Sequence, residues 1–177
     1  LVDDAPEGTK EALLVKLAAL ATKTKDAGTP SQPAELDTAE KLLAASIEHN
    51  ERVHDVLRAL TERCGGEYHP GPVKKAERIE AKANDDYKGD VTKVVDTIRG
   101  SSILKSLVGF ADAVDALLGE SGDGSGGGGA AEGAVTPIVI RVKDRVTTPL
   151  DTGYMDVLLN LTVPGCPVVC ELQLHWE

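Results

Sequence analysis

The sequence has no excess of positive charge. Its 177 residues include 19 Lys and Arg against 29 Asp and Glu, which gives a formal net charge of −10 at pH 7. A chain with this charge is repelled by the phosphate backbone of nucleic acids and by anionic lipid headgroups. We therefore expect no general nucleic-acid binding and no docking on an anionic membrane.

Long hydrophobic runs are missing too. Spanning a bilayer takes about 20 consecutive apolar residues, and the sequence contains neither such a run nor a signal-peptide pattern. We expect an intracellular protein without a membrane span. The chain starts at Leu1 and stops just after a strand-like segment. We therefore expect it to be part of something larger, with other domains or an assembly as partners.

Cysteine is scarce and occurs only at Cys64, Cys166 and Cys170. An odd number, without a second Cys pair or a Cys/His cluster, gives no support to a zinc site. Cys170 falls on the apolar side of a strand-like segment, so we predict that it is a buried free thiol. Unpaired thiols fit the reducing environment inside cells.

The C-terminal third of the sequence contains regular alternation of apolar residues with others. Alternation with period two is typical of strands that bury one face, and it predicts strands of one sheet over residues 137–143, 156–163 and 168–176. The Pro-Gly-Cys-Pro segment at 164–167 predicts a hairpin between the last two strands. One face of this sheet is expected to be apolar throughout, from Ile138 onward.

The opposite face of the predicted sheet carries polar side chains. They come from all three strands and are Arg141, Lys143, Asn160, Glu171, Gln173 and His175. In a purely structural sheet, such residues simply face solvent. Taken as a group, two cations, a carboxylate, an amide and an imidazole form a set that can bind a phosphorylated ligand together with a metal ion. The pattern is compatible with both interpretations.

Two amphipathic segments precede the sheet. Apolar residues at helical spacing predict helices over residues 7–25 and 34–63. We predict that the two helices form an antiparallel hairpin over residues 1–66, which covers part of the sheet or a partner surface. Residues 67–177 are then expected to form a second domain that carries the chemistry.

A basic segment begins near Pro72, a residue that suits the start of a helix. Lys74, Arg78 and Lys82 are four residues apart, which places them on one ridge of the predicted helix. Like charges at this spacing repel, so we expect an anion to neutralise them. One candidate is a bound polyphosphate. The other is the group of carboxylates in the same stretch, namely Glu77, Glu80, Asp85 and Asp86.

One more strand and one more helix are predicted before the C-terminal strands. The strand covers residues 94–103, with Asp96 near its start and Arg99 inside it, and the helix covers residues 106–118. The Gly-rich segment 121–133 matches no phosphate-binding loop and predicts a flexible insertion. Together the elements predict an α+β fold in which helices pack on a mixed sheet.

Five short motifs, in this order, carry a resemblance to a known family. They are the basic helix with Lys74, Arg78 and Lys82, the strand with Asp96 and Arg99, Arg141-Val142-Lys143-Asp144, Gly153-Tyr154 and Glu171-Leu172-Gln173. From residue 71 to residue 176 the sequence resembles the synthetase domain of the RelA/SpoT family, which has a nucleotidyltransferase-type fold. Enzymes of that family make alarmones by moving a pyrophosphate from ATP to the 3′-hydroxyl of GDP or GTP.

The resemblance implies a role for each matching residue. Asp96 and Glu171 correspond to the two catalytic carboxylates that hold Mg²⁺, a hard cation that prefers oxygen ligands. Tyr154 corresponds to the ring that stacks on the acceptor guanine. The cations that grip the donor triphosphate correspond to Lys74, Lys82, Arg99 and Lys143. The implied nucleotide site is completed by Arg78, Arg141, Gln173 and His175.

Three positions depart from the family pattern. Leu158 stands where the family has an acceptor-site His, Pro72 where it has an adenine-binding Arg, and His175 where it has a further Arg. The first hypothesis is a metal-dependent pyrophosphokinase or nucleotidyltransferase that binds a purine nucleoside triphosphate such as ATP or GTP. The alternative is a catalytically degenerate RelA/SpoT-like fold that acts as a binding or structural module.

Overall fold

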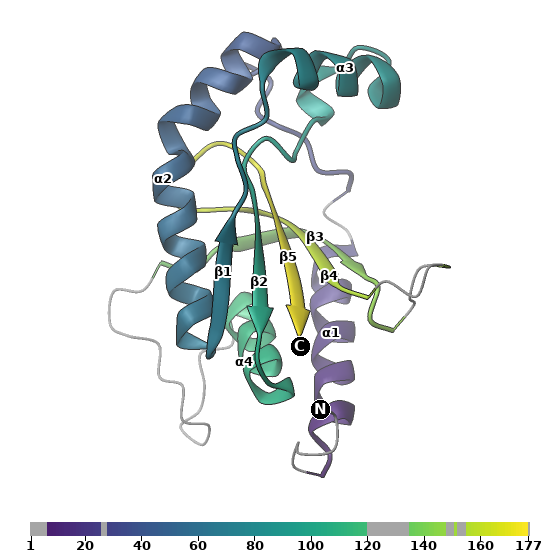
Figure 1. The fold of residues 1–177 in the computed structure, drawn as a ribbon. Coiled ribbons are helices and arrows are strands. Elements are labelled where there is room, and N and C mark those ends of the chain that lie inside the picture. The colour runs from purple at the N-terminus through teal and green to yellow at the C-terminus, as the bar shows by residue number, and fades with distance from the viewer. Residues whose placement is uncertain (1–6, 26–27, 120–134, 148–150, 152–154, 177) are drawn as a thin grey trace.

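A five-stranded mixed sheet forms the centre of the protein. The computed structural model describes residues 7–25, 28–119, 135–147, 151 and 155–176. The strands are β1 Gly66–Pro70, β2 Arg99–Leu104, β3 Ile138–Asp144, β4 Val157–Thr162 and β5 Cys170–Trp176. Their order in the sheet is β1-β2-β5-β4-β3, with β2 and β5 parallel and the other neighbours antiparallel. The predicted α+β fold is confirmed, and so is the sheet formed by the three C-terminal strands (Figure 1).

Three helices cover one face of this sheet. They are α1 Thr9–Thr24, α2 Ala39–Arg63 and α4 Leu107–Leu118. Thr61 of α2 hydrogen-bonds Ser102 of β2 at 2.6 Å, and Phe110 of α4 meets the ring of Trp176 edge to face. Ser102 and Trp176 point to the same side because their positions along the paired strands β2 and β5 differ by an even number. The core therefore lies between this face and the three helices.

The two N-terminal helices do not pack mainly on each other. In the described part of the chain, α1 packs against α4 and β3, whereas α2 packs against β1, β2 and the helix α3 Ala76–Tyr87. The predicted helical hairpin is wrong in this respect, because both helices bury their leucines in the core shared with the strands. The division of the chain between residues 66 and 67 stays a prediction.

The sequence pattern missed strand β1. After α2 the chain turns at Gly65, whose φ is 72°. Gly66 already pairs with Leu104 of β2, and a Cβ atom there would lie 2.8 Å from the carbonyl oxygen of Ile103. Only Tyr68 among the five residues of β1 is buried, so the strand gives too weak an alternation to be recognised.

Two further predictions failed for local reasons. The register of β3 against β4 shifts between Val139 and Arg141, so Val139 and Val142 pack on the core while Ile138 is 60% exposed. The expected uninterrupted apolar face is therefore wrong at a β-bulge, which changes which side chains point inward. The strand predicted over residues 94–103 begins only at Arg99, which leaves Asp96 in the preceding loop.

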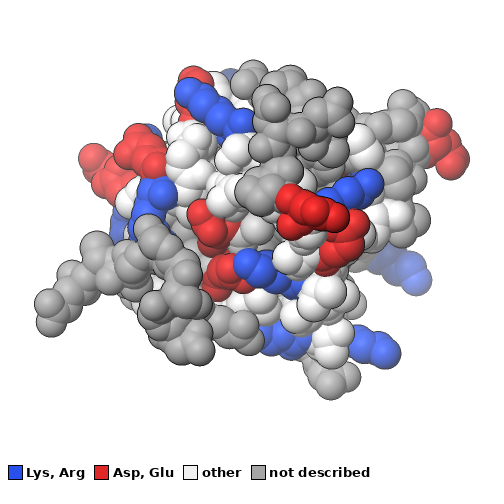
Figure 2. Space-filling view, turned by 90° about the horizontal axis from the view of Figure 1, so that it is seen from below, with Lys and Arg blue, Asp and Glu red and all other residues white. Residues whose placement is uncertain are grey.

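The surface carries charges of both signs (Figure 2), and the cysteines are buried. No helix in the described ranges is both long and apolar enough to cross a membrane. Positive and negative side chains lie side by side over the face seen in Figure 2. Cys64, Cys166 and Cys170 are buried free thiols, which confirms the prediction for Cys170.

Candidate active site

The strand register brings most of the predicted site residues onto one face of the sheet. Residues that are direct cross-strand partners point to the same side. One row across the sheet consists of Arg141, Asn160, Glu171 and Arg99, and the next consists of Lys143, Leu158, Gln173 and Ser101. The predicted common face of Glu171 and Lys143 is confirmed. The row with Glu171 lies at the amino ends of the parallel pair β2 and β5, near α3 in Figure 1.

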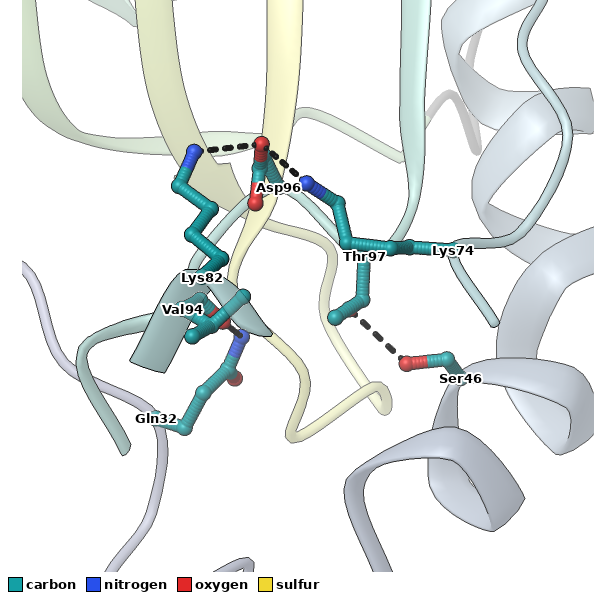
Figure 3. Close-up of polar contacts among 7 residues, drawn as sticks. All are labelled: Gln32, Ser46, Lys74, Lys82, Val94, Asp96 and Thr97. Carbon is teal, nitrogen blue, oxygen red and sulfur yellow. Dashed lines mark hydrogen bonds and ion pairs between the residues drawn. The ribbon is translucent and has the colours of Figure 1, made fainter. Parts of the chain in front are cut away.

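Asp96 lies at the centre of a buried ion-pair network. Only 7% of the residue is exposed, and its Oδ2 atom accepts hydrogen bonds from Lys74 Nζ and from Lys82 Nζ, each at 2.8 Å (Figure 3). Burial raises the pKa of Asp96, but the bonds and charges of the two lysines outweigh it and hold this pKa below its ordinary value. Asp96 is thus the carboxylate that neutralises the two lysines.

The predicted basic ridge is wrong at Lys74, whereas Arg78 and Lys82 both lie on α3. Gly71 and Lys74 donate backbone hydrogen bonds to the carbonyls of Arg99 and Thr97, so the chain is extended there and α3 starts only at Ala76. Lys74 therefore reaches Asp96 from outside the helix, and Lys82 reaches it from α3. Arg78 is exposed on α3, and its predicted role in nucleotide binding stays a prediction.

The second oxygen of Asp96 is available for a ligand. Asp96 Oδ1 is buried and has no hydrogen-bond partner among the described residues. Burial, and next the charge of Asp96, raise the pKa of Glu171, against the opposing effect of the nearby cations. Two carboxylates that repel each other, one with a bare buried oxygen, have the chemistry to hold a divalent cation.

A Mg²⁺ ion fits this donor set. The described residues contain no cluster of three or more His, Cys, Asp or Glu side chains that could enclose a metal alone. Mg²⁺ commonly binds through one or two carboxylates and completes its shell with water and substrate phosphates. Asp96 and Glu171 are the residues that would hold such an ion.

Cations crowd beside Glu171. Burial lowers the pKa of Lys143, and the charges of Arg141 and Arg145 lower it further, while Glu171 opposes this shift. Arg145 is engaged by Asp156, with which it forms two hydrogen bonds of 2.5 and 2.7 Å. Mutual repulsion between Arg141 and Lys143 makes this part of the face attractive to an anion.

Asn160 is a site residue that the resemblance did not identify. Its side chain is fully buried, and its Oδ1 atom accepts a 2.9 Å hydrogen bond from Arg141 Nε. The Nδ2 atom of Asn160 is buried without a hydrogen-bond partner in the described structure. The buried amide holds the guanidinium of Arg141 over the site face. The strand alternation places Asn160 on this face, but no local pattern predicts its bond to Arg141.

A cavity of about 370 Å³ opens beside Glu171. It is lined by His69, Pro70, Gly71, Arg99, Gly100, Ser101, Glu171 and Gln173. A second hollow shares His69 and Ser101 with the first and reaches His175. Burial lowers the pKa of His175, whereas the carboxylate of Asp156 acts to raise it. Tyr154 and the Gly-rich segment 121–133 lie outside the described residues.

Replacing Glu171 by glutamine is expected to stabilise the protein in the absence of ligands at neutral pH. Because the folded-state pKa of Glu171 is raised from 4.5, the fold favours the neutral form. That contribution is fully present below pH 4.5 and is lost as pH rises through the raised pKa. Denaturant unfolding should therefore show a stability gain for Glu171→Gln that is absent in acid and grows toward neutrality. A loss of stability at neutral pH would contradict the electrostatic account.

The comparisons with known proteins support a divergent RelA/SpoT-like fold. No protein-family model matches the sequence. A stretch of 66 residues, 37% of this chain, is 33% identical to the (p)ppApp synthetase toxin Tas1 of Pseudomonas aeruginosa (strain UCBPP-PA14) and covers 15% of that protein. The structure also resembles a chain from the crystal structure of the type VI effector Tas1 with its immunity protein. That similarity has a TM-score of 0.56 and 26% identity, and it covers 77% of this chain and 60% of the solved one.

Proposed function

We propose that this domain is a Mg²⁺-dependent pyrophosphokinase that binds ATP and transfers its pyrophosphate to a second purine nucleotide. The observation that carries the proposal is the buried, unpartnered Oδ1 atom of Asp96 next to the charge of Glu171. The similarity to a synthetase toxin supports the same chemistry. Because its substrates are cellular nucleotides, we place its action inside a cell.

The cations around the two carboxylates are assigned to the triphosphate. Lys82, Arg99 and Lys143 come from α3, β2 and β3, so they can contact the phosphates from different sides. Mg²⁺, when bound by Asp96 and Glu171, supplies positive charge that offsets the charge of the phosphates. Lys74 is more enclosed than Lys82, with side chains that are 12% and 30% exposed, and it helps to keep Asp96 ionised.

The transfer itself is a displacement at phosphorus. The oxygen of the acceptor 3′-hydroxyl bonds to the β-phosphorus of ATP, and the bond from that phosphorus to the oxygen bridging the α- and β-phosphates breaks. AMP leaves with the electron pair of that bond. The hydroxyl proton passes to the carboxylate of Glu171, which lies on the site face and is the group that we propose as general base.

An adenosine nucleotide is the acceptor that we propose. Leu158 is 7% exposed and lies between Lys143 and Gln173 on the site face, where the RelA/SpoT pattern has a His. The loss of this polar group alters the acceptor site. The name of the relative, a (p)ppApp synthetase, indicates an adenosine acceptor for that protein.

A binding module without turnover is the second candidate. Lys74 and Lys82 both bind Asp96, so part of the site is neutralised without any ligand. The related effector is known in a complex with an immunity protein, and a protein partner of that kind is what we propose for a binding module. In that case nucleotides would leave the stability of the chain unchanged.

A thermal melt with ATP and Mg²⁺ separates the two candidates. A ligand at about one hundred times its dissociation constant stabilises the folded state by about 2.7 kcal/mol. We expect this gain for the unaltered chain, and we expect Glu171→Gln to lose its metal-dependent part. Lys82→Ala should weaken ATP binding with or without metal. If ATP, GTP and Mg²⁺ all leave the melting curve of the unaltered chain unmoved, the enzyme proposal is wrong.

A further inference from the structure

Gln32, which lies between α1 and α2, uses its whole side-chain amide inside the protein. It is 4% exposed, and Nε2 donates to the carbonyl oxygens of Val94 and Val169, each at 3.0 Å. Oε1 accepts a 2.8 Å hydrogen bond from the backbone N–H of Val169. Both amide hydrogens and the amide oxygen are therefore engaged, so a single side chain joins two segments that are distant in the sequence.

These two segments carry the two carboxylates of the site. Val94 precedes Asp96 by two residues, and Val169 precedes Glu171 by two residues. Gln32 thus connects the loop of Asp96 directly to the start of the strand of Glu171. The contact between Gln32 and Val94 lies beneath Asp96 and Lys82 in Figure 3.

The sheet alone does not fix this loop. The first pair between β2 and β5 is Arg99 with Glu171, so Asp96 lies outside the ladder. On the C-terminal side of Asp96, Thr97 Oγ1 accepts a 2.8 Å hydrogen bond from Ser46 Oγ of α2. Both residues are fully buried. Gln32 on one side and Ser46 on the other therefore hold the short segment in which Asp96 lies.

We propose that Gln32 is a positioning residue that sets the separation of Asp96 and Glu171 for one shared divalent cation. The inference rests on the proposed function. Mg²⁺ requires nearly ideal octahedral geometry, so its affinity depends on where the carboxylates are held. Contacts with the phosphates come from lysines and arginines that Gln32 does not touch. Loss of Gln32 should therefore weaken the cation site and leave metal-free nucleotide binding intact.

The test compares Gln32→Met with the unaltered chain. Methionine has nearly the volume of glutamine and lacks its hydrogen bonds. Mn²⁺ affinity is measured from the free-ion electron paramagnetic resonance signal, and ATP affinity without metal is measured by calorimetry in EDTA. Removing outer-shell partners typically lowers metal affinity by about 10–100-fold. We expect a loss of that size for Mn²⁺ and an unchanged affinity for metal-free ATP.

A matched control separates positioning from general destabilisation. Thr61→Val removes the buried hydrogen bond between α2 and Ser102, which does not connect the two carboxylate segments. This variant should be less stable and should bind Mn²⁺ like the unaltered chain. If Gln32→Met does not fold, Ser46→Ala removes a second contact that holds this segment and should also weaken Mn²⁺ binding selectively.

The outcomes distinguish the inference from the function on which it rests. If folded Gln32→Met binds Mn²⁺ as tightly as the unaltered chain does, the positioning role alone is overturned. If Gln32→Met does not fold, unchanged Mn²⁺ affinity in Ser46→Ala has the same consequence. Equal losses of Mn²⁺ and metal-free ATP affinity also overturn it, because they indicate a purely structural role. Absence of Mn²⁺ binding in the unaltered chain overturns the proposed function and the inference together.

Discussion

Replacing Asp96 by asparagine is expected to destabilise the ligand-free protein by about 3 kcal/mol, the lower end of the range for breaking a buried ion pair. The substitution leaves Lys74 and Lys82 without their common carboxylate. The side chain of Lys74 is 12% exposed and that of Lys82 is 30% exposed. Water therefore solvates the unpaired charge of Lys82 better than that of Lys74. Urea unfolding at neutral pH measures the change.

The pH dependence gives this prediction a second test. The folded-state pKa of Asp96 lies below its ordinary value of 3.8 because its two lysine partners outweigh the effect of burial. A depressed carboxyl pKa contributes stability that is present above pH 3.8 and is lost as pH falls through the folded-state value. The loss of unfolding free energy in Asp96→Asn should therefore become smaller as the pH is lowered.

A surface ion pair provides the matched control. Asp55 and Arg58 form a 2.8 Å pair on α2, with side chains that are 64% and 40% exposed. Exposed pairs contribute about 0–1 kcal/mol, so Asp55→Asn should change the stability little. An effect of Asp96→Asn no larger than that of Asp55→Asn would show that the Asp96 network is not a buried ion-pair network in solution.

Pyrophosphate transfer is expected to fall by about 10²–10⁴-fold in Glu171→Gln. A positioned general base typically contributes an effect of this size, and the variant also loses one of the two oxygen ligands proposed for Mg²⁺. Binding of metal-free ATP should persist, because the cations around the site remain. The measurement is the rate of AMP formation under saturating ATP.

The control for this variant is Glu67→Gln. Glu67 lies on β1 with a side chain that is 63% exposed, and its Oε1 atom lies 3.5 Å from Nε2 of His69. Removing this charge leaves both proposed metal ligands in place, so the transfer rate should remain close to that of the unaltered chain. If Glu171→Gln transfers pyrophosphate as fast as Glu67→Gln, Glu171 takes no part in the reaction.

Alternation in the sequence was sufficient to predict the three C-terminal strands and their polar face. Glu171 and Lys143 share that face because strand periodicity and pairing depend only on local backbone geometry. The position of Asp96 beside Glu171 came from the family resemblance, since no local pattern relates residues that are 75 positions apart.

The sequence predictions were wrong where tertiary contacts override the local preference of the chain for a helix or a strand. Pro72 suggested a helix start, but backbone hydrogen bonds from this segment to the residues before and at the start of β2 keep it extended. Ile138 followed the alternation, but a bulge turned it outward. Gln32 gave no signal at all, because a single glutamine between helices acquires its role only when the loops of Val94 and Val169 meet.

The formation of AMP from ATP is the most direct test of the proposed activity. The unaltered chain is incubated with ATP, Mg²⁺ and an adenosine or guanosine nucleotide, and the products are separated by anion-exchange chromatography. We predict AMP together with an equal amount of a 3′-pyrophosphorylated nucleotide, in a reaction that requires Mg²⁺ and favours the adenosine acceptor. Recovery of ATP and both acceptors unchanged would contradict the assignment of Asp96 and Glu171 to a working transferase site.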